Sequence, residues 1–97
     1  MEFKKDLSGP LEFIANHYGL NAQRTKTIEE LAELIRALVR TDLADIAEEI
    51  ADVEIMLYQF KYLTGTTRDI DWIKDQKVTR QLERIKSEEE KNDNKDI

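Results

Sequence analysis

The chain lacks cysteine and contains only one proline, one histidine and three glycines among its 97 residues. Without cysteine it can form no disulfide, and it offers no thiolate for zinc, for an iron–sulfur cluster or for nucleophilic catalysis. It also lacks an apolar run long enough for a signal peptide or a membrane-spanning helix. From these absences we expect a protein of the cytoplasm that has no membrane partner.

The sequence has no stripe of basic residues, and its formal net charge is -6. Phosphate backbones are held mainly by clustered lysine and arginine, so we expect no nucleic-acid polymer as a partner. With 40% hydrophobic and 37% charged residues, the chain should be globular with a heavily solvated surface. At this length the core of a monomer is small, which favours self-association.

Few helix-breaking residues are present, and they divide the chain into helical segments. Pro10 favours the first turn of a short helix, and Gly19 and Gly65 favour helix ends. Thr41 or Asp42 can cap the third helix. The predicted helices span about residues 8–18, 21–40, 42–63 and, starting near 67 or 69, up to 86. This pattern predicts an all-α fold, a helical bundle of three to four main helices that is completed by oligomerisation.

The predicted bundle forms one all-helical domain over residues 1–86. Residues 87–97 are highly charged and contain no apolar residue before the last, so we expect a disordered tail there. Within the second helix, a packing stripe repeats at the 3.6-residue period and comprises Ile28, Leu31, Ala32, Ile35, Leu38 and Val39. In the third helix, Glu49 falls within the apolar arc, close to Val53, where a solvated carboxylate is not expected.

Two pairs of carboxylates are set into these apolar helices, Glu30 with Glu33 and Glu49 with Asp52. Residues three apart share a helix face. If the two helices pack together, four acids converge in place of a core, which is tolerable only if cations neutralise them. Mg²⁺ prefers such hard oxygen ligands and completes its shell with water and substrate phosphates. The pattern therefore predicts a Mg²⁺ site, with Mn²⁺ as an alternative ion.

Other metal classes fit this pattern less well. Zinc sites use histidine or cysteine ligands, and di-iron bundles pair glutamate with histidine three residues later. The single histidine, His17, lies outside both acidic helices. Mg²⁺ held against a polyphosphate can polarise a phosphoryl oxygen and activate water, so no protein nucleophile is required.

The two acidic segments, Glu29-Glu30-Leu31-Ala32-Glu33-Leu34 and Glu48-Glu49-Ile50-Ala51-Asp52-Val53, resemble the MazG-like branch of the all-α nucleoside triphosphate pyrophosphatases. The resemblance extends over about residues 17–86. It implies hydrolysis of a nucleoside or deoxynucleoside triphosphate to the monophosphate and pyrophosphate, with water attacking the α-phosphorus. It also implies a homodimer or homotetramer, and it makes the four acids the implied Mg²⁺ ligands and catalytic residues.

Three basic residues are candidates for binding substrate phosphate. Lys77 and Arg80 resemble basic residues that some family members place on the following helix near the phosphates. Lys26 lies one turn before Glu30, so it can serve either as a phosphate ligand or as a surface ion-pair partner of that acid. The spacer between the acidic pairs is shorter than in many relatives.

Two further interpretations remain open. The chain can be a non-catalytic helical module that dimerises and binds a partner, or a degenerate family member that binds nucleotide or metal without turnover. An acidic pair on a helix is often only a solvated face. His17 and Tyr18 can be packing residues, surface residues or contacts to a nucleotide base, and no residue is identified that would grip a base.

Overall fold

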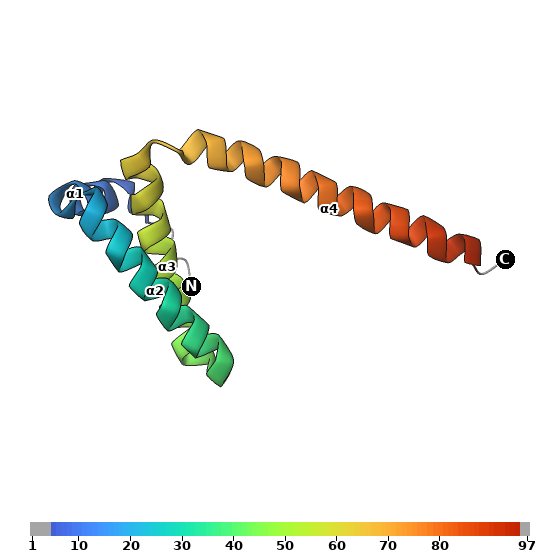
Figure 1. The fold of residues 1–97 in the computed structure, drawn as a ribbon, viewed down its shortest axis with the longest axis horizontal. Helices are drawn as coiled ribbons and strands as arrows, with labels where there is room; N and C mark the ends of the chain where they lie inside the picture. Colours follow the sequence, from blue (N-terminus) through green and yellow to red (C-terminus); the bar gives the residue numbers. More distant parts are fainter. Residues whose placement is uncertain (1–4, 96–97) are drawn as a thin grey trace. The chain divides into compact units, whose positions relative to one another are not determined.

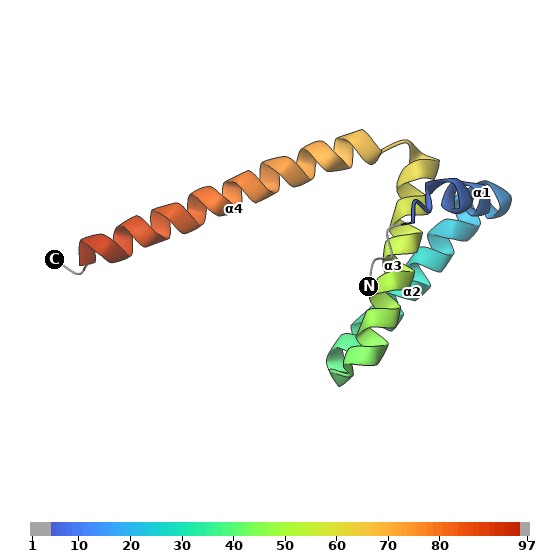
Figure 2. The same cartoon turned by 180° about the vertical axis from the view of Figure 1, so that it is seen from behind.

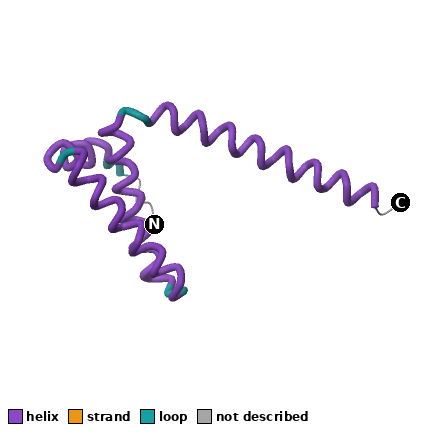
Figure 3. Tube along the Cα trace, in the orientation of Figure 1, coloured by secondary structure: helices purple, strands orange, loops and turns teal. Residues whose placement is uncertain are grey.

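A computed structural model describes residues 5–95, which form four helices joined by short loops and no strand (Figure 3). The predicted all-α fold is confirmed. The helices are α1 (Ser8–Tyr18), α2 (Leu20–Arg40), α3 (Leu43–Thr64) and α4 (Thr67–Lys95). No helix in this part of the chain combines the length and the apolar character needed to cross a bilayer.

Local chemistry at the loops explains where the helices end. Gly19, which alone separates α1 from α2, has φ 86°, a conformation that glycine adopts without steric cost. Asp42 caps α3, because its side chain accepts hydrogen bonds from the backbone N–H groups of Ala44 and Asp45 at 3.0 and 3.4 Å. Gly65, with φ 67°, ends α3 in the left-handed conformation.

Helices α2 and α3 form an antiparallel hairpin, and α1 packs against one end of it (Figures 1 and 2). Only two residues separate α2 from α3, so the two helices must lie side by side. Two side-chain hydrogen bonds join α1 to α3: Asn16 Nδ2 donates to Tyr62 Oη at 2.9 Å, and Tyr58 Oη donates to Glu12 Oε2 at 3.0 Å. The three helices form one compact unit that ends at Gly65.

The face of α2 that packs against α3 is more polar than the sequence pattern predicted. Its buried or partly buried residues recur at intervals of three and four and are Gln23, Thr27, Glu30, Leu34 and Ala37. The predicted packing stripe points elsewhere: Ile28, Ile35 and Val39 are 59%, 62% and 79% exposed in the single chain. The predicted stripe is therefore not covered within the described part of the single chain, because a 3.6-residue period identifies an apolar face and not what covers it.

The core of the first unit is small. Its buried apolar residues are Ala15, Ala37, Val53 and Met56. Two of these four are alanines, which contribute little apolar area. Large apolar side chains of the hairpin, by contrast, stay substantially exposed, Ile28, Ile35 and Val39 among them.

Helix α4 belongs to a second unit that begins at Thr66. It continues to Lys95, past the residue at which we expected the charged tail to begin. Glutamate and lysine favour helices, and no glycine or proline follows Gly65, so the chain has no local reason to stop the helix at Lys86. The last two residues of the expected tail, 96–97, lie outside the described residues. A single domain over residues 1–86 stays a prediction.

Candidate metal centre

Three carboxylates from two helices come together between α2 and α3. Glu30 lies on α2, and Glu49 and Asp52 lie on α3. One carboxylate oxygen from each residue can be chosen so that all three lie within 4.8 Å of one another. All three residues are partly buried. We call Glu30, Glu49 and Asp52 the acidic cluster.

Glu49 is the most constrained member of the acidic cluster. Its Oε2 is buried and has no hydrogen-bond partner among the described residues. Burial raises the pKa of the Glu49 carboxyl, and the negative charges of Asp52, Glu30, Glu33 and Glu48 raise this pKa further, in decreasing order. A buried, unpaired acceptor surrounded by like charges destabilises the fold unless a cation or a proton neutralises it.

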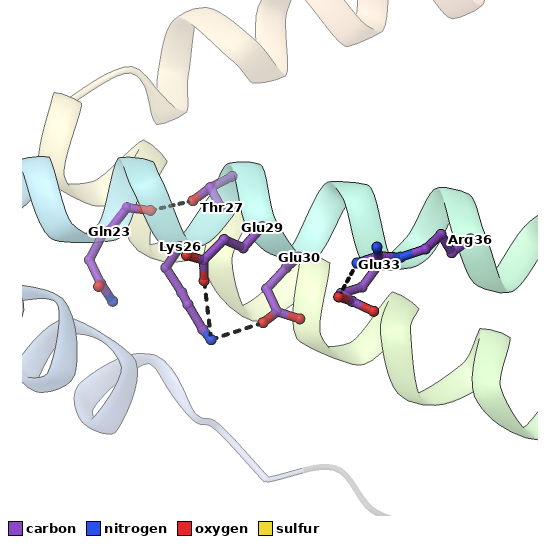
Figure 4. A network of polar contacts seen from close by, with 7 residues as sticks. All are labelled: Gln23, Lys26, Thr27, Glu29, Glu30, Glu33 and Arg36. Carbon is purple, nitrogen blue, oxygen red and sulfur yellow. Dashed lines mark hydrogen bonds and ion pairs between the residues drawn. The ribbon is translucent and has the colours of Figure 1, made fainter.

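Lys26 supplies the one positive charge that directly contacts the acidic cluster within the described residues. Its Nζ lies 3.2 Å from Oε1 of Glu30 and 3.7 Å from Oε2 of Glu29 (Figure 4). The hydrogen bond and the charge of Glu30, followed by the charge of Glu29, raise the pKa of Lys26. The Glu30 side chain is 13% exposed, whereas that of Lys26 is 54% exposed. The lysine therefore reaches the cluster from the solvent side.

The fourth predicted ligand, Glu33, lies outside the acidic cluster. Its carboxylate forms an ion pair with Arg36, one turn further along α2, and its side chain is 47% exposed (Figure 4). The charge of Glu33 still contributes to the raised pKa of Glu49. The structure thus brings three of the four predicted acids together and directs the fourth towards a local arginine.

Two of the predicted phosphate-binding residues lie on α4. Lys77 and Arg80 are exposed and belong to the second unit. Their contact with a substrate phosphate stays a prediction.

Sequence reasoning missed a pair of buried amides close to the acidic cluster. Gln23 on α2 and Gln59 on α3 are 5% and 1% exposed, and Gln23 Nε2 donates a hydrogen bond to Gln59 Oε1. The spacing of these glutamines from the acids could have indicated that they share a helix face. Gln23 lies seven residues before Glu30, and Gln59 lies seven residues after Asp52, so each lies on the same face as an acid of the cluster, two turns away.

The residues of the acidic cluster suit a hard divalent cation. The donors are all carboxylate oxygens, which is the ligand type that Mg²⁺ prefers, and no histidine or cysteine lies among them. The orphaned Oε2 of Glu49 is an acceptor that lacks a partner and that a cation would satisfy. Three close carboxylates also leave coordination positions for water and phosphate oxygens, which is the usual arrangement in Mg²⁺ sites that bind nucleotides.

Comparison with known families gives a match that extends over most of the chain. The family described as phosphoribosyl-ATP pyrophosphohydrolase matches residues 11–89, which include the whole acidic cluster. No curated protein and no solved structure matches the chain in the corresponding comparisons.

Proposed function

The chain belongs to the phosphoribosyl-ATP pyrophosphohydrolase family, part of the MazG-like all-α nucleoside triphosphate pyrophosphatases, and on that premise we propose a Mg²⁺-dependent reaction. The chain hydrolyses a nucleoside or deoxynucleoside triphosphate to the monophosphate and pyrophosphate, with water attacking the α-phosphorus. Phosphoribosyl-ATP, which the family description names, contains an ATP triphosphate chain and is one candidate substrate. The buried, unpartnered oxygen of Glu49 within the acidic cluster is the observation on which this proposal depends most.

Glu30, Glu49 and Asp52 hold the ion in this proposal. Glu33 is the fourth ligand, and it must first leave Arg36 to act as one. When bound, Mg²⁺, or Mn²⁺ in its place, would neutralise the acids and stabilise negative charge that develops on phosphate oxygens. An exposed ion pair such as Glu33–Arg36 costs little to break, so the fourth carboxylate is available at low energetic cost.

The remaining charged side chains have two proposed roles: basic residues bind the substrate phosphates, and a carboxylate orients the attacking water. Lys26 already pairs with the solvent-facing side of Glu30, so a phosphate placed beside the cluster meets a positive charge there. Lys77 and Arg80 are the further phosphate-binding candidates. A carboxylate of the cluster, or the neighbouring Glu48, accepts a hydrogen bond from the attacking water and orients it. No protein nucleophile is needed for this reaction.

We also propose that the active form is a homo-oligomer, either a dimer or a tetramer. The proposal is supported by the exposed apolar side chains on the outside of the hairpin, including Ile35 on α2 and Ile50 on α3, which are 62% and 41% exposed. A second copy that covers this surface would supply the apolar burial that the small core lacks.

The decisive experiment incubates the purified chain and Mg²⁺ with ATP, deoxynucleoside triphosphates, modified nucleotides and phosphoribosyl-ATP, and measures pyrophosphate and orthophosphate separately. We expect pyrophosphate as the first product. Glu49→Gln should abolish its release, because the variant replaces a charged ligand by a neutral amide. Glu54→Gln is the matched control, since it makes the same substitution at an exposed position of α3 and should leave turnover unchanged.

Other results would select other functions. Orthophosphate as the first product would place the attack at the terminal phosphate and contradict the proposed reaction. Stabilisation by Mg²⁺ without turnover of any substrate would indicate a degenerate, binding-only member. If neither turnover nor stabilisation by Mg²⁺ is seen, the helical association module is favoured, because a ligand that binds only the folded state must stabilise it.

A further inference from the structure

A cavity of about 470 Å³ lies beside the buried amide pair, at the end of the hairpin where α1 packs. Its wall comes from α1, α2 and α3 and includes Ile14, Tyr18, Gln23, Lys26, Met56 and Gln59. All of these residues belong to the first compact unit. The wall therefore combines apolar side chains, one aromatic ring, two amides and one lysine, the mixture expected in a small-molecule site.

The two amides keep unused hydrogen-bonding capacity. Gln23 Nε2 donates to Gln59 Oε1, which leaves the Oε1 acceptor of Gln23 and the Nε2 donor of Gln59. Among the described residues, neither of these two groups has a further hydrogen-bond partner, and neither is a fully enclosed polar atom. Both residues line the cavity, so the second acceptor and the second donor belong to side chains of its wall.

The amide pair occupies a buried position of the kind that apolar side chains usually fill. Gln59 is the largest fully buried side chain in the described part of the chain. Burying a polar group brings a desolvation cost that a hydrogen bond offsets only in part. Leucine or methionine fills such positions without this cost.

The cavity and the acidic cluster are connected by one row of side chains on α2. Gln23, Lys26 and Glu30 project from the same side of the helix (Figure 4). Lys26 contributes both to the wall of the cavity and to the ion pair with Glu30. From Gln23 to Glu30 the helix rises about 10 Å, which is on the scale of a nucleoside rather than of a phosphate alone.

We propose that this cavity binds the base of the nucleotide substrate, and that Gln23 and Gln59 together read a neutral base edge on which a hydrogen-bond donor lies beside an acceptor. The proposal rests on the proposed function, because it places the triphosphate at Lys26 and the acidic cluster. Tyr18, which is 60% exposed, offers a ring on which the base can stack, and Met56 offers an apolar contact in the same wall. The occupant is a neutral heterocycle, since among the described residues Lys26, at the phosphate end, is the only charged residue of the wall.

A titration observed by NMR tests the pocket without relying on turnover or on metal. The ¹⁵N-labelled full-length chain, in EDTA, is titrated with adenosine monophosphate and, separately, with ribose 5-phosphate, which lacks only the base. We expect adenosine monophosphate to shift the side-chain amide signals of Gln23 and Gln59, and ribose 5-phosphate to leave them in place. The wild-type protein suffices for this measurement, so its outcome does not depend on the folding of any variant.

Variants then assign the effect to the amides. The double substitution Gln23→Leu with Gln59→Leu removes both partners together and leaves no unpaired amide in the core. The double variant should bind adenosine monophosphate about tenfold more weakly, because two hydrogen bonds of ordinary strength are lost. It should leave the affinity for ribose 5-phosphate unchanged. Gln76→Met, at an exposed position of α4, is the control for a glutamine substitution elsewhere.

Three results would overturn the proposal. Equal shifts from the two ligands would show a phosphate site without a base pocket. If the side-chain amide signals of Gln23 and Gln59 do not shift at saturating nucleotide, the amide pair has only a structural role. Signals that move with protein concentration alone would show that a second copy fills the cavity. If nucleotide shifts the NMR signals of the two amides but no triphosphate is hydrolysed, the base pocket is supported and the proposed reaction is contradicted.

Discussion

Replacing Ile35 by serine should dissociate the proposed oligomer without unfolding the chain. Ile35 lies on the outward stripe of α2 and is 62% exposed in the single chain. Full burial of an isoleucine side chain contributes roughly 1.5–3 kcal/mol, so covering the remaining surface is worth about 1–2 kcal/mol per copy. A two-fold symmetric interface contains the residue twice, which gives about 2–4 kcal/mol. The dimer dissociation constant should therefore rise roughly 30-fold to 1000-fold.

Sedimentation equilibrium over a series of protein concentrations measures this change directly. Serine and isoleucine have similar helix propensities, so the substitution changes apolar area and little else in α2. Ile35→Met is the matched control, because it keeps a large apolar side chain at the same position and should leave the dissociation constant near its wild-type value. A wild-type chain that stays monomeric at every concentration, or a serine variant that associates like the wild type, would refute the reasoning.

The remaining predictions concern the acidic cluster, the lysine beside it and the cap of α3. Because the folded-state pKa of Glu49 is raised, its contribution to stability is present at low pH and is lost as the pH rises through that pKa. In EDTA, Glu49→Gln should therefore be more stable than the wild type at about pH 8, with a difference that shrinks towards about pH 4 in urea unfolding; a constant difference would contradict this. Lys26→Met should raise the KM for nucleotide roughly tenfold in steady-state assays, because it removes the positive charge beside Glu30; an unchanged KM would show that Lys26 does not bind phosphate. Asp42→Ala should cost about 1 kcal/mol of stability by removing the side-chain hydrogen bonds to Ala44 and Asp45, while Asp42→Asn should cost far less in the same thermal unfolding experiment.

Helix positions could be predicted from the sequence because local residues determine them. Gly19, Asp42 and Gly65 act within a turn of their own position, through left-handed backbone conformations or a capping carboxylate. The sequence does not determine by itself which face of α2 is turned inward. An apolar stripe signals burial, but the hydrophobic effect has no direction, and Ile35 can be buried by the same chain or by another.

The same distinction between local and non-local information applies to the candidate site. The three-residue spacing of Glu49 and Asp52 places them together whatever surrounds α3. Glu33 was expected beside them, yet Arg36 lies within reach on the same helix and competes for its carboxylate. Gln59 escaped notice because a single glutamine among apolar residues looks like a solvated position. Only the packing of α2 against α3 shows that Gln59 meets Gln23.

The two faces of α2 together explain how so small a chain can keep charges inside the α2–α3 hairpin. The inward face, with Gln23 and Glu30, contributes little hydrophobic stabilisation, and the acids of the cluster repel one another without a cation. The larger apolar side chains of α2 are on the outward face, around Ile35, where the described part of the chain leaves them exposed and where the proposed oligomer would bury them. Folding, metal binding and association are therefore expected to be thermodynamically linked, because each neutralises or buries what the others leave unsatisfied. An inward face filled with leucine would bury more apolar area, but it would lack the carboxylates and amides on which the proposed metal and nucleotide sites depend.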